Sequence, residues 1–336
     1  MNDAVPVSIA EATRLAARAL SRAGASARAA DSTAKALVAA ERDGQKGHGL
    51  SRVASYAGQV RRGKVAGAAE PSLTRLSEAA ITVDAGLGFA YPAIDAAIEA
   101  LIPIARTSHV ALAAIRRSHH FGQAGLHVER LAEEGLIALL FGNTPKAMAF
   151  WGGAKPMMGT NPIAFAAPCP HAPPLVIDLA LSVAARAKIV AAKTARETIP
   201  IDWAFDEHRR PTTDAAAALK GSMAPAGGPK GAALALMVEV LGAALTGAHF
   251  GFEASSFLDA EGSAPDMGHI IIAIDPGPVS GGAYSSRMAD LIAAIASEAV
   301  RLPGSTRLKN RQQAAERGLL IAPRLLSEIR TLAGEV

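Results

Sequence analysis

Residues 43–52 read Asp-Gly-Gln-Lys-Gly-His-Gly-Leu-Ser-Arg, with one histidine between two glycines and an arginine four positions later. Imidazole exchanges protons near neutral pH, and guanidinium holds a carboxylate through two parallel hydrogen bonds. His48 and Arg52 therefore predict an acid/base group and an anion clamp that act on one small 2-oxo or 2-imino acid. A histidine at a helix end is more often structural, and this stretch alone leaves that alternative open.

Two helices are expected before this stretch. Ser8 and Glu11 have the spacing of a capping box, and Gly24 supplies a stop, which predicts a helix over 8–23. A second helix, capped by its first serine, is expected over 26–42. The stretch 43–52 would then follow directly on a helical N-terminal layer.

From residue 80 onward, short apolar runs separated by helical segments indicate an α/β region. A helix opened by Pro92 should bend or end near Pro103, and 230–245 is apolar enough to be a largely buried helix. A last helix opens at Pro323, and the N- and C-terminal helices are expected to share a layer because each must bury an apolar stripe. The expected strands are 80–83, 110–115, 136–141, 163–166, 175–179 and 269–274.

Composition narrows the class of protein. The chain has 336 residues, of which 50% are hydrophobic, so it can bury a large core. A net charge of only +4 with dispersed lysines and arginines argues against a nucleic-acid partner, and no apolar run is long enough for a membrane span. Cys169 is the only cysteine, which excludes an intrachain disulfide and a multi-cysteine metal site and fits a reducing cytoplasm. No metal site is expected.

One stretch imitates a dinucleotide-binding motif. Residues 81–88 read as a strand followed by Gly86-Leu87-Gly88, but the third glycine of the motif is replaced by Tyr91. The sequence therefore favours a tight turn here over a Rossmann fingerprint.

Four further motifs follow the His48 stretch in a fixed order: Ser-His-His-Phe-Gly at 118–122, Phe-Gly-Asn-Thr-Pro at 141–145, Gly-Thr-Asn-Pro-Ile-Ala-Phe at 159–165 and Pro-Lys-Gly at 229–231. Together they resemble the malate/L-lactate dehydrogenase family of NAD(P)-dependent oxidoreductases, which is unrelated to the Rossmann-type lactate and malate dehydrogenases. The resemblance extends from about residue 7 to about residue 332.

The resemblance implies an α/β, non-Rossmann malate/L-lactate (sulfolactate) dehydrogenase-like fold. Its sheet would be mixed or largely antiparallel and flanked by helices, with a helical layer from both termini. We expect residues 1–75 plus 285–336 to form a helical substrate-side layer, and 76–284 to form an α/β region that binds the nicotinamide cofactor. The cofactor would be NAD or NADP, with the choice left open, and the protein would be a homodimer.

The resemblance also assigns cofactor-binding residues, and each has a simpler reading. Gly122 would let backbone amides approach a phosphate, but a strand end turning into a helix explains it equally well. Lys230 begins a helix and could bind phosphate, although a solvated lysine is the default. Asp178 could orient the nicotinamide amide or cap a helix or turn. The expected set is His120, Phe121, Gly122, Gln123, Ala124, Asp178, Leu179, Ala180, Lys230, Arg301, Gly304 and Arg307.

Two positions bear on the substrate. In cyclic-imine reductases of the family, a serine directly before the histidine and a later aspartate form a relay with it; here these positions hold Gly47 and Lys188. Lys46 and Lys188 could instead favour a doubly anionic substrate, such as a sulfonated or dicarboxylic 2-oxo acid, or could simply be solvated. Residues 44–52 and 252–257 look most like the sulfolactate-dehydrogenase branch.

The sequence therefore predicts an NAD(P)-dependent 2-hydroxyacid dehydrogenase acting on a small anionic 2-oxo or 2-hydroxy acid. His48 would be the proton donor and acceptor, while Arg52 and Thr160 would fix the substrate carboxylate, with Lys46 and Lys188 nearby. Two alternatives remain: a reductase of cyclic 2-imino acids, and a non-catalytic relative that only binds cofactor.

Overall fold

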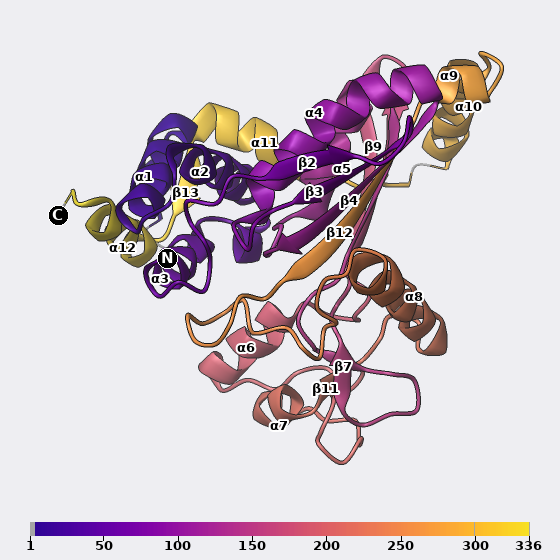
Figure 1. Ribbon diagram of the computed structural model, residues 1–336. Coiled ribbons are helices and arrows are strands. Elements are labelled where there is room, and N and C mark those ends of the chain that lie inside the picture. The colour runs from indigo at the N-terminus through magenta and orange to yellow at the C-terminus, as the bar shows by residue number, and fades with distance from the viewer. Residues whose placement is uncertain (1–3, 299, 336) are drawn as a thin grey trace.

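A seven-stranded sheet forms the centre of the computed structural model, which describes residues 4–298 and 300–335 (Figure 1). Its strands lie in the order β2 (Ser72–Arg75), β3 (Ala80–Asp84), β4 (Val110–Ser118), β12 (Met267–Ile274), β5 (Ile137–Gly142), β8 (Ile163–Cys169) and β9 (Ala172–Leu179). Strands β3 and β4 run parallel, and the other neighbours in this sheet are antiparallel. The mixed, largely antiparallel sheet and all six expected strands are thus confirmed.

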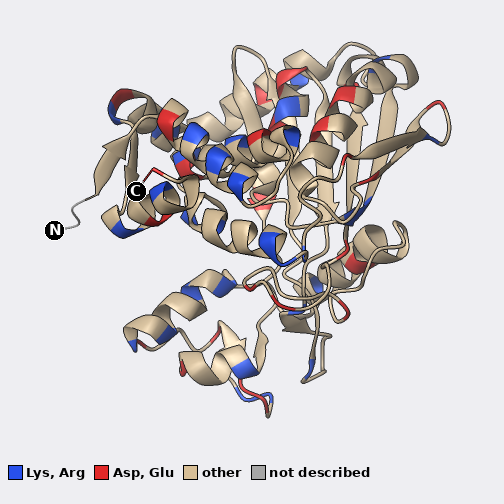
Figure 2. Ribbon diagram, turned by 60° about the vertical axis from the view of Figure 1, so that its left-hand side comes forward, with Lys and Arg blue, Asp and Glu red and all other residues tan. Residues whose placement is uncertain are grey.

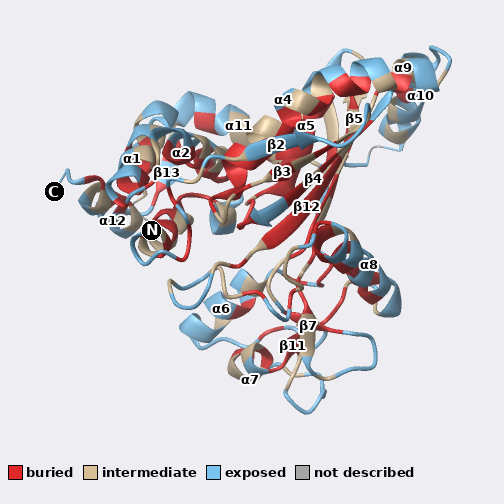
Figure 3. Ribbon diagram, in the orientation of Figure 1, coloured by how far each residue is buried: buried red, intermediate tan, exposed pale blue. Residues whose placement is uncertain are grey.

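Both faces of the sheet are covered at its central strands, which explains the continuous apolar runs of these strands. Neighbouring residues of a strand point to opposite faces. In β12, Ile271 belongs to the apolar cluster shared with helices α4 (Ala90–Ser108) and α5 (Ala124–Glu133), whereas Ile270 and Ile272 belong to a cluster on the other face. Figure 3 shows the central strands buried between these two layers.

Helices from both chain ends form a third layer beside the sheet, as predicted (Figure 1). It contains α1 (Ile9–Arg22), α2 (Ala27–Arg42), α3 (Val53–Arg61), α11 (Ser305–Arg317) and α12 (Pro323–Ala333), together with β1 (Val5–Val7) paired to β13 (Leu319–Ile321). Helix α10 (Tyr284–Ser297) instead contacts β8. The division into a 1–75 plus 285–336 layer and a 76–284 region remains a prediction.

The predicted helix starts are confirmed in most details. Ser8 Oγ accepts a hydrogen bond from the backbone N–H of Glu11 at 3.1 Å, and Gly24 follows α1 with φ of +110°. Ser26 Oγ likewise accepts from the N–H of Ala29 at 3.2 Å. The predicted capping role of the Glu11 carboxylate is wrong, because this side chain accepts a hydrogen bond from Arg330 of α12 at 3.1 Å. The contact joins the first and last helices of the chain.

Two helix expectations need correction. Helix α4 runs unbroken through Pro103 to Ser108, because its buried apolar face keeps it packed against the sheet, so the expected end at the proline is wrong. Helix α8 (Pro229–Glu239) continues into a π-helical turn, η3 (Val240–Ala244), but it is not largely buried. Large apolar side chains on it stay exposed, including Leu236 at 46% and Val240 at 52%.

A second, four-stranded sheet was not predicted. It contains β10 (Ala204–Phe205), β11 (Ser222–Met223), β6 (Met148–Ala149) and β7 (Pro156–Met158), and it lies with α6 (Arg186–Ala195) and α7 (Ala215–Lys220) below the central sheet in Figure 1. Strands of two or three residues are too short to show an alternating pattern.

Charged residues of both signs are interspersed along the surface helices (Figure 2). Many of them pair locally, as Lys35 does with Asp31 one turn away on α2. Within residues 4–298 and 300–335, no helix has the length and apolarity needed to cross a membrane.

Buried ion pairs join the terminal layer to the helices over the sheet. Arg311 of α11 donates to both carboxylate oxygens of Asp43 at 2.7 Å and to those of Glu129, on α5, at 2.9 and 2.6 Å. The side chains of Asp43 and Glu129 are 0% and 4% exposed. Removing the arginine would leave two carboxylates buried without their main counter-charge.

We therefore expect Arg311→Met to lower the free energy of unfolding by about 3–5 kcal/mol, the usual cost of breaking a buried pair. Arg330→Met, which removes a partly exposed pair with Glu11 in the same layer, should cost no more than about 1 kcal/mol. Urea unfolding of both variants measures the two values, and equal losses would contradict the structural importance of Arg311.

Candidate functional site

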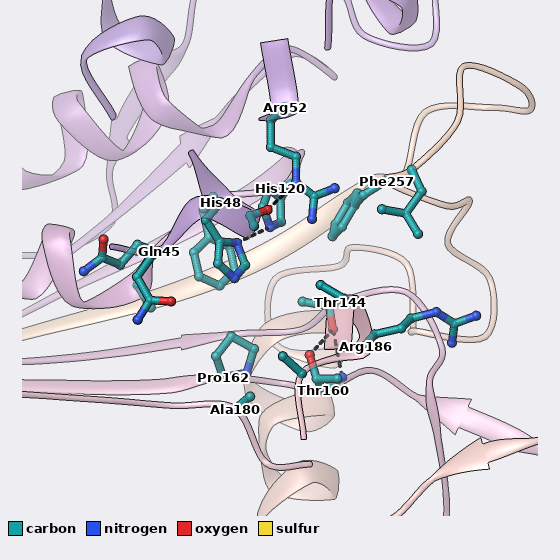
Figure 4. Close-up of a pocket in the computed structure, with 18 of the residues that line it drawn as sticks. Gln45, His48, Arg52, His120, Thr144, Thr160, Pro162, Ala180, Arg186 and Phe257 are labelled. Carbon is teal, nitrogen blue, oxygen red and sulfur yellow. Dashed lines mark hydrogen bonds between the residues drawn. The ribbon is translucent and has the colours of Figure 1, made fainter. Parts of the chain in front are cut away.

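A cavity of about 750 Å³ opens between the terminal layer, one end of the sheet and α6 (Figure 4). Its size is typical of small-molecule sites, which occupy roughly 300–1,000 Å³. The predicted residues that line it are Lys46, His48, Arg52, His120, Phe121, Gly122, Gln123, Ala124, Thr160, Asp178, Ala180 and Lys188. Motifs separated by more than 130 positions in the sequence therefore meet at one cavity.

Two short 3-10 turns hold His48 and Arg52 at the cavity. They are η1 (Lys46–His48) and η2 (Leu50–Arg52), and the Glu41 carboxylate anchors them by accepting from the Leu50 N–H at 3.0 Å. Gly49 is required between the turns, because a Cβ there would overlap the same carboxylate. Arg52 Nε donates to the Gly47 carbonyl at 2.7 Å, which fixes the guanidinium against the turn that carries His48.

His48 is the outer end of a buried chain of polar rings. Its Nδ1 lies 3.3 Å from His120 Nε2, His120 Nδ1 lies 2.5 Å from the Tyr56 hydroxyl, and that hydroxyl lies 3.4 Å from the hydroxyl of Tyr91. Burial, followed by the charge of Arg52, lowers the pKa of His48 to about 4. Burial also lowers the pKa of His120 far below its usual value and raises that of Tyr56 to about 12. The chain is therefore uncharged at neutral pH.

Thr160 faces His48 and Arg52 across the cavity (Figure 4). Its backbone N–H donates to Thr144 Oγ1 at 3.0 Å, and the two hydroxyl oxygens lie 3.5 Å apart. The turn is anchored from behind by the buried carboxylate of Glu239, which accepts from Asn161 Nδ2 at 2.9 Å and from the Gly159 N–H at 3.3 Å. The sequence analysis did not predict a role for Thr144 or Glu239. Thr144 lies within the 141–145 motif and could have been found there, whereas Glu239 lies in no recognisable motif.

Asp178 has the capping role that the sequence left open. Its Oδ2 accepts from the backbone N–H of Gly125 at 2.8 Å, in the first turn of α5. The residue is open to the cavity, yet the surrounding protein raises the pKa of its carboxyl group by desolvation. The carboxylate thus neutralises a helix N-terminus at the place where a phosphate could otherwise bind.

The cavity wall is strongly cationic. Lys46, Arg52, Lys146, Arg186 and Lys188 line it, with Asp178 as the acidic residue among the lining side chains. Arg186 begins α6, and no ion pair is found for it within residues 4–298 and 300–335. Lys188 is exposed, and its Nζ lies 5.6 Å from the centre of the Trp203 ring, within range of a cation–π contact. Such a wall suits an anionic ligand.

Five predicted cofactor residues lie outside the cavity lining: Leu179, Lys230, Arg301, Gly304 and Arg307. Arg307 is buried and donates to Glu129 at 3.1 Å, so its guanidinium already has a carboxylate partner. Arg301 donates to Thr306 Oγ1 at 2.6 Å, and Lys230 lies in the first turn of α8, as predicted. In the described part of the chain, no group of histidine, cysteine or acidic side chains could hold a metal ion.

The residues at the cavity fit an elongated anionic cofactor. The segment 120–124 ends at the start of α5 beside Asp178, and the cationic side chains line the same cavity. The buried Gln123 Oε1 has no hydrogen-bond partner among the described residues and is available to a ligand group. Gly122 has a second reason to be glycine, since a Cβ there would lie 2.7 Å from the Tyr91 hydroxyl.

Comparison with known sequences points to one family. The family model described as malate/L-lactate dehydrogenase matches residues 7–330. A protein of Chromohalobacter salexigens named (2R)-3-sulfolactate dehydrogenase (NADP(+)) is 50% identical over 327 residues, covering 97% of this chain and 98% of that protein. A Δ1-pyrroline-2-carboxylate/Δ1-piperideine-2-carboxylate reductase of Pseudomonas putida is 38% identical over 299 residues, covering 88% of each chain.

Solved structures give the same result. The Δ1-piperideine-2-carboxylate reductase of Pseudomonas syringae superposes with a TM-score of 0.93 at 36% identity, covering 98% of this chain and 99% of that one. The sulfolactate dehydrogenase of Methanocaldococcus jannaschii superposes with a TM-score of 0.89 at 28% identity, covering 98% and 97%. The non-Rossmann fold expected from the sequence motifs is confirmed.

The buried histidines predict acid sensitivity. Burial lowers the pKa of His119 and of His269 to about 3, so between pH 6.5 and 5 the unfolded chain binds protons that the folded chain does not. The free energy of unfolding should therefore decrease as the pH is lowered from 6.5 to 5, by up to about 1.4 kcal/mol per pH unit for each such histidine. Thermal unfolding from pH 7.5 to 5 measures the slope. His269→Gln should reduce the slope by the share of one histidine, and the exposed-site control His208→Gln should leave it unchanged. A flat wild-type profile would refute the argument.

Proposed function

Because the chain belongs to the malate/L-lactate dehydrogenase family, we propose that it is an NADP- or NAD-dependent dehydrogenase that interconverts a small 2-hydroxy acid and its 2-oxo acid. The observation that carries the proposal is the meeting of His48, Arg52 and Thr160 at one cationic cavity. An acid/base group, a carboxylate clamp and a hydroxyl are the protein groups that this reaction needs beside the cofactor.

Each of the three side chains has a proposed task. Arg52 holds the substrate carboxylate through its two terminal nitrogens, since its Nε is occupied by Gly47, and the Thr160 hydroxyl supports the same carboxylate from the facing wall. The dihydronicotinamide ring, when bound, supplies the hydride that reaches C2 of the substrate. His48 gives a proton to the oxygen on C2 during reduction and takes it back during oxidation.

Substrate binding should change the charge balance around His48. The charge of Arg52 is one of the two causes of the low pKa of His48. A carboxylate on Arg52 neutralises that charge, so the pKa of His48 rises towards its usual value when substrate is present. A larger fraction of His48 therefore carries the proton to be transferred in the complex than in the free protein.

The cofactor would lie along the segment 120–124 and the end of β9, where Asp178 and Ala180 line the cavity. Lys230, Arg301 and Gly304 remain candidates for its outer phosphates. Arg307 is a weaker candidate because Glu129 already pairs with it. The NADP(+) in the name of the relative that is 50% identical supports NADP as the first cofactor to test.

We propose 3-sulfolactate and 3-sulfopyruvate as the preferred substrate pair, ahead of malate or lactate. The relative from Chromohalobacter salexigens supports this choice by its name. The excess of cations in the cavity supports it independently, because Lys46, Arg186 and Lys188 remain for a second anionic group after Arg52 has bound the first.

A reductase of cyclic 2-imino acids is the second candidate. It is favoured by the relatives of that name and by the TM-score of 0.93 to one of them. Gly47 and Lys188 argue against it, since they stand where the resemblance expects the serine and aspartate of the imine-reductase relay. A relative that binds cofactor without catalysis is the third possibility, and the presence of His48, Arg52 and Thr160 argues against that.

The experiment follows oxidation of NADPH and of NADH with 3-sulfopyruvate, oxaloacetate, pyruvate and the five- and six-membered cyclic imino acids at equal concentrations. We expect the highest kcat/KM with 3-sulfopyruvate and NADPH. His48→Ala should lower kcat by about 10² to 10⁴-fold while the fluorescence titration of NADPH stays unchanged. Preference for the imino acids would establish the second candidate, and NADPH binding without turnover would establish the third.

We also propose that the protein is a homodimer and acts in the cytoplasm. The dimer is supported by exposed apolar side chains on α8 and η3, namely Leu234, Leu236, Met237 and Val240. Sedimentation velocity should give twice the 34.3-kDa chain mass, and Leu236→Glu should shift it to the monomer. Leu76→Glu, at an exposed leucine of another surface, is the control. A wild-type monomer would refute the dimer.

A further inference from the structure

Tyr91, the residue that breaks the apparent glycine motif, ends the polar chain that begins at His48. Three contacts make up the chain: His48 Nδ1 to His120 Nε2, His120 Nδ1 to the Tyr56 hydroxyl, and the Tyr56 hydroxyl to the Tyr91 hydroxyl. Tyr56 is 0% exposed and Tyr91 is 2% exposed, so water does not compete with these contacts. The direction of each hydrogen bond then depends on the neighbouring one.

Counting hydrogens selects one direction. Tyr56 is the partner of the Tyr91 hydroxyl among the described residues, so the Tyr91 proton has an acceptor only when it points to the Tyr56 oxygen. The Tyr56 proton must then point to His120 Nδ1, which places the His120 proton on Nε2. The opposite direction would leave the Tyr91 proton buried without an acceptor, which is unfavourable.

The last link concerns His48. Its Nδ1 faces His120 Nε2, and when that nitrogen carries a proton, Nδ1 of His48 must accept it. A neutral His48 then carries its own proton on Nε2, for which the structure shows no protein partner in residues 4–298 and 300–335. His48 lines the cavity, so this proton is available to the ligand (Figure 4).

We propose that Tyr56, acting through His120, is a positioning residue that keeps the proton of neutral His48 on Nε2, where it can donate a hydrogen bond to the substrate oxygen. Tyr91 supports this direction without being required for it, because His120 Nδ1 remains an acceptor for the Tyr56 proton when the Tyr91 hydroxyl is removed. This chain performs the orienting role that Gly47 and Lys188 cannot perform in this protein. Its catalytic consequence rests on the proposed function, but the position of the proton does not.

The surroundings support a donor at Tyr56. The phenol is packed edge-on against His119 and tilted against Phe89, and burial keeps it protonated by raising its pKa to about 12. Arg52 is the charged residue whose field reaches Tyr56, His48 and His120. Within the described residues, no carboxylate is a hydrogen-bond partner of Tyr56, His48 or His120. The tautomers of the two histidines are therefore not set by a neighbouring negative charge.

The direct test is ¹⁵N NMR of the ligand-free protein with ¹⁵N-labelled histidine, in which ring nitrogens with and without a proton have distinct shifts. At pH 7.5 we expect both His48 and His120 to be protonated on Nε2. In Tyr56→Phe the His120 and His48 signals should move towards a mixture of the two tautomers, whereas Tyr91→Phe, the matched control, should keep Nε2–H on both rings. A wild-type His48 protonated on Nδ1 would overturn the proposal without any variant.

Kinetics gives the second readout. Tyr56→Phe should lower kcat for oxo-acid reduction at least roughly tenfold with little change in KM for cofactor, and Tyr91→Phe should change kcat less than about threefold. Equal losses in both variants, or an unchanged kcat in Tyr56→Phe, would overturn the positioning role. If no substrate is turned over, the proposed function fails, while the NMR result still decides where the proton lies.

Discussion

The buried contacts of Arg311 with Asp43 and Glu129 determine where the site can form. Asp43 is the last residue before the glycine-rich turns that carry His48 and Arg52, and Glu129 lies on α5, whose start lines the same cavity. One guanidinium bound to both carboxylates therefore sets the distance between the substrate clamp and the expected cofactor segment. Because the desolvated charges cannot separate without a large penalty, the two sides of the cavity keep a fixed spacing.

A second buried carboxylate fixes the opposite wall. Glu239 accepts hydrogen bonds from the turn that presents Thr160 and from the N–H of Gly251, which precedes the 254–258 segment of the cavity. The π-helical turn that follows Glu239 brings Gly242 close to Asn143, where a Cβ would lie 2.8 Å from the backbone nitrogen. Although α8 is largely exposed, its last residue, Glu239, is buried and holds the turn that presents Thr160. These hydrogen bonds also keep the exposed helix in place.

The sequence predicted what short-range patterns encode. Six strands were found because each contains a continuous apolar run, and the His48 motif was found because its residues are adjacent. The polar chain was not found, because Tyr56 and Tyr91 look like ordinary core aromatics until folding brings Tyr56 to His120, 64 positions away, and Tyr91 to Tyr56. Arg186 carried no signal either, since an isolated arginine at a helix start is usually solvated.

The site separates its proton chemistry from its charge. The rings behind His48 are uncharged because burial favours their neutral forms, whereas the cations lie on the cavity wall where a ligand can reach them. An anionic substrate can therefore be attracted by the wall, and Arg52 is the cation of that wall whose charge also lowers the pKa of His48. In the proposed function, the substrate carboxylate would offset the charge of Arg52, so binding of the acid and protonation of His48 would be coupled.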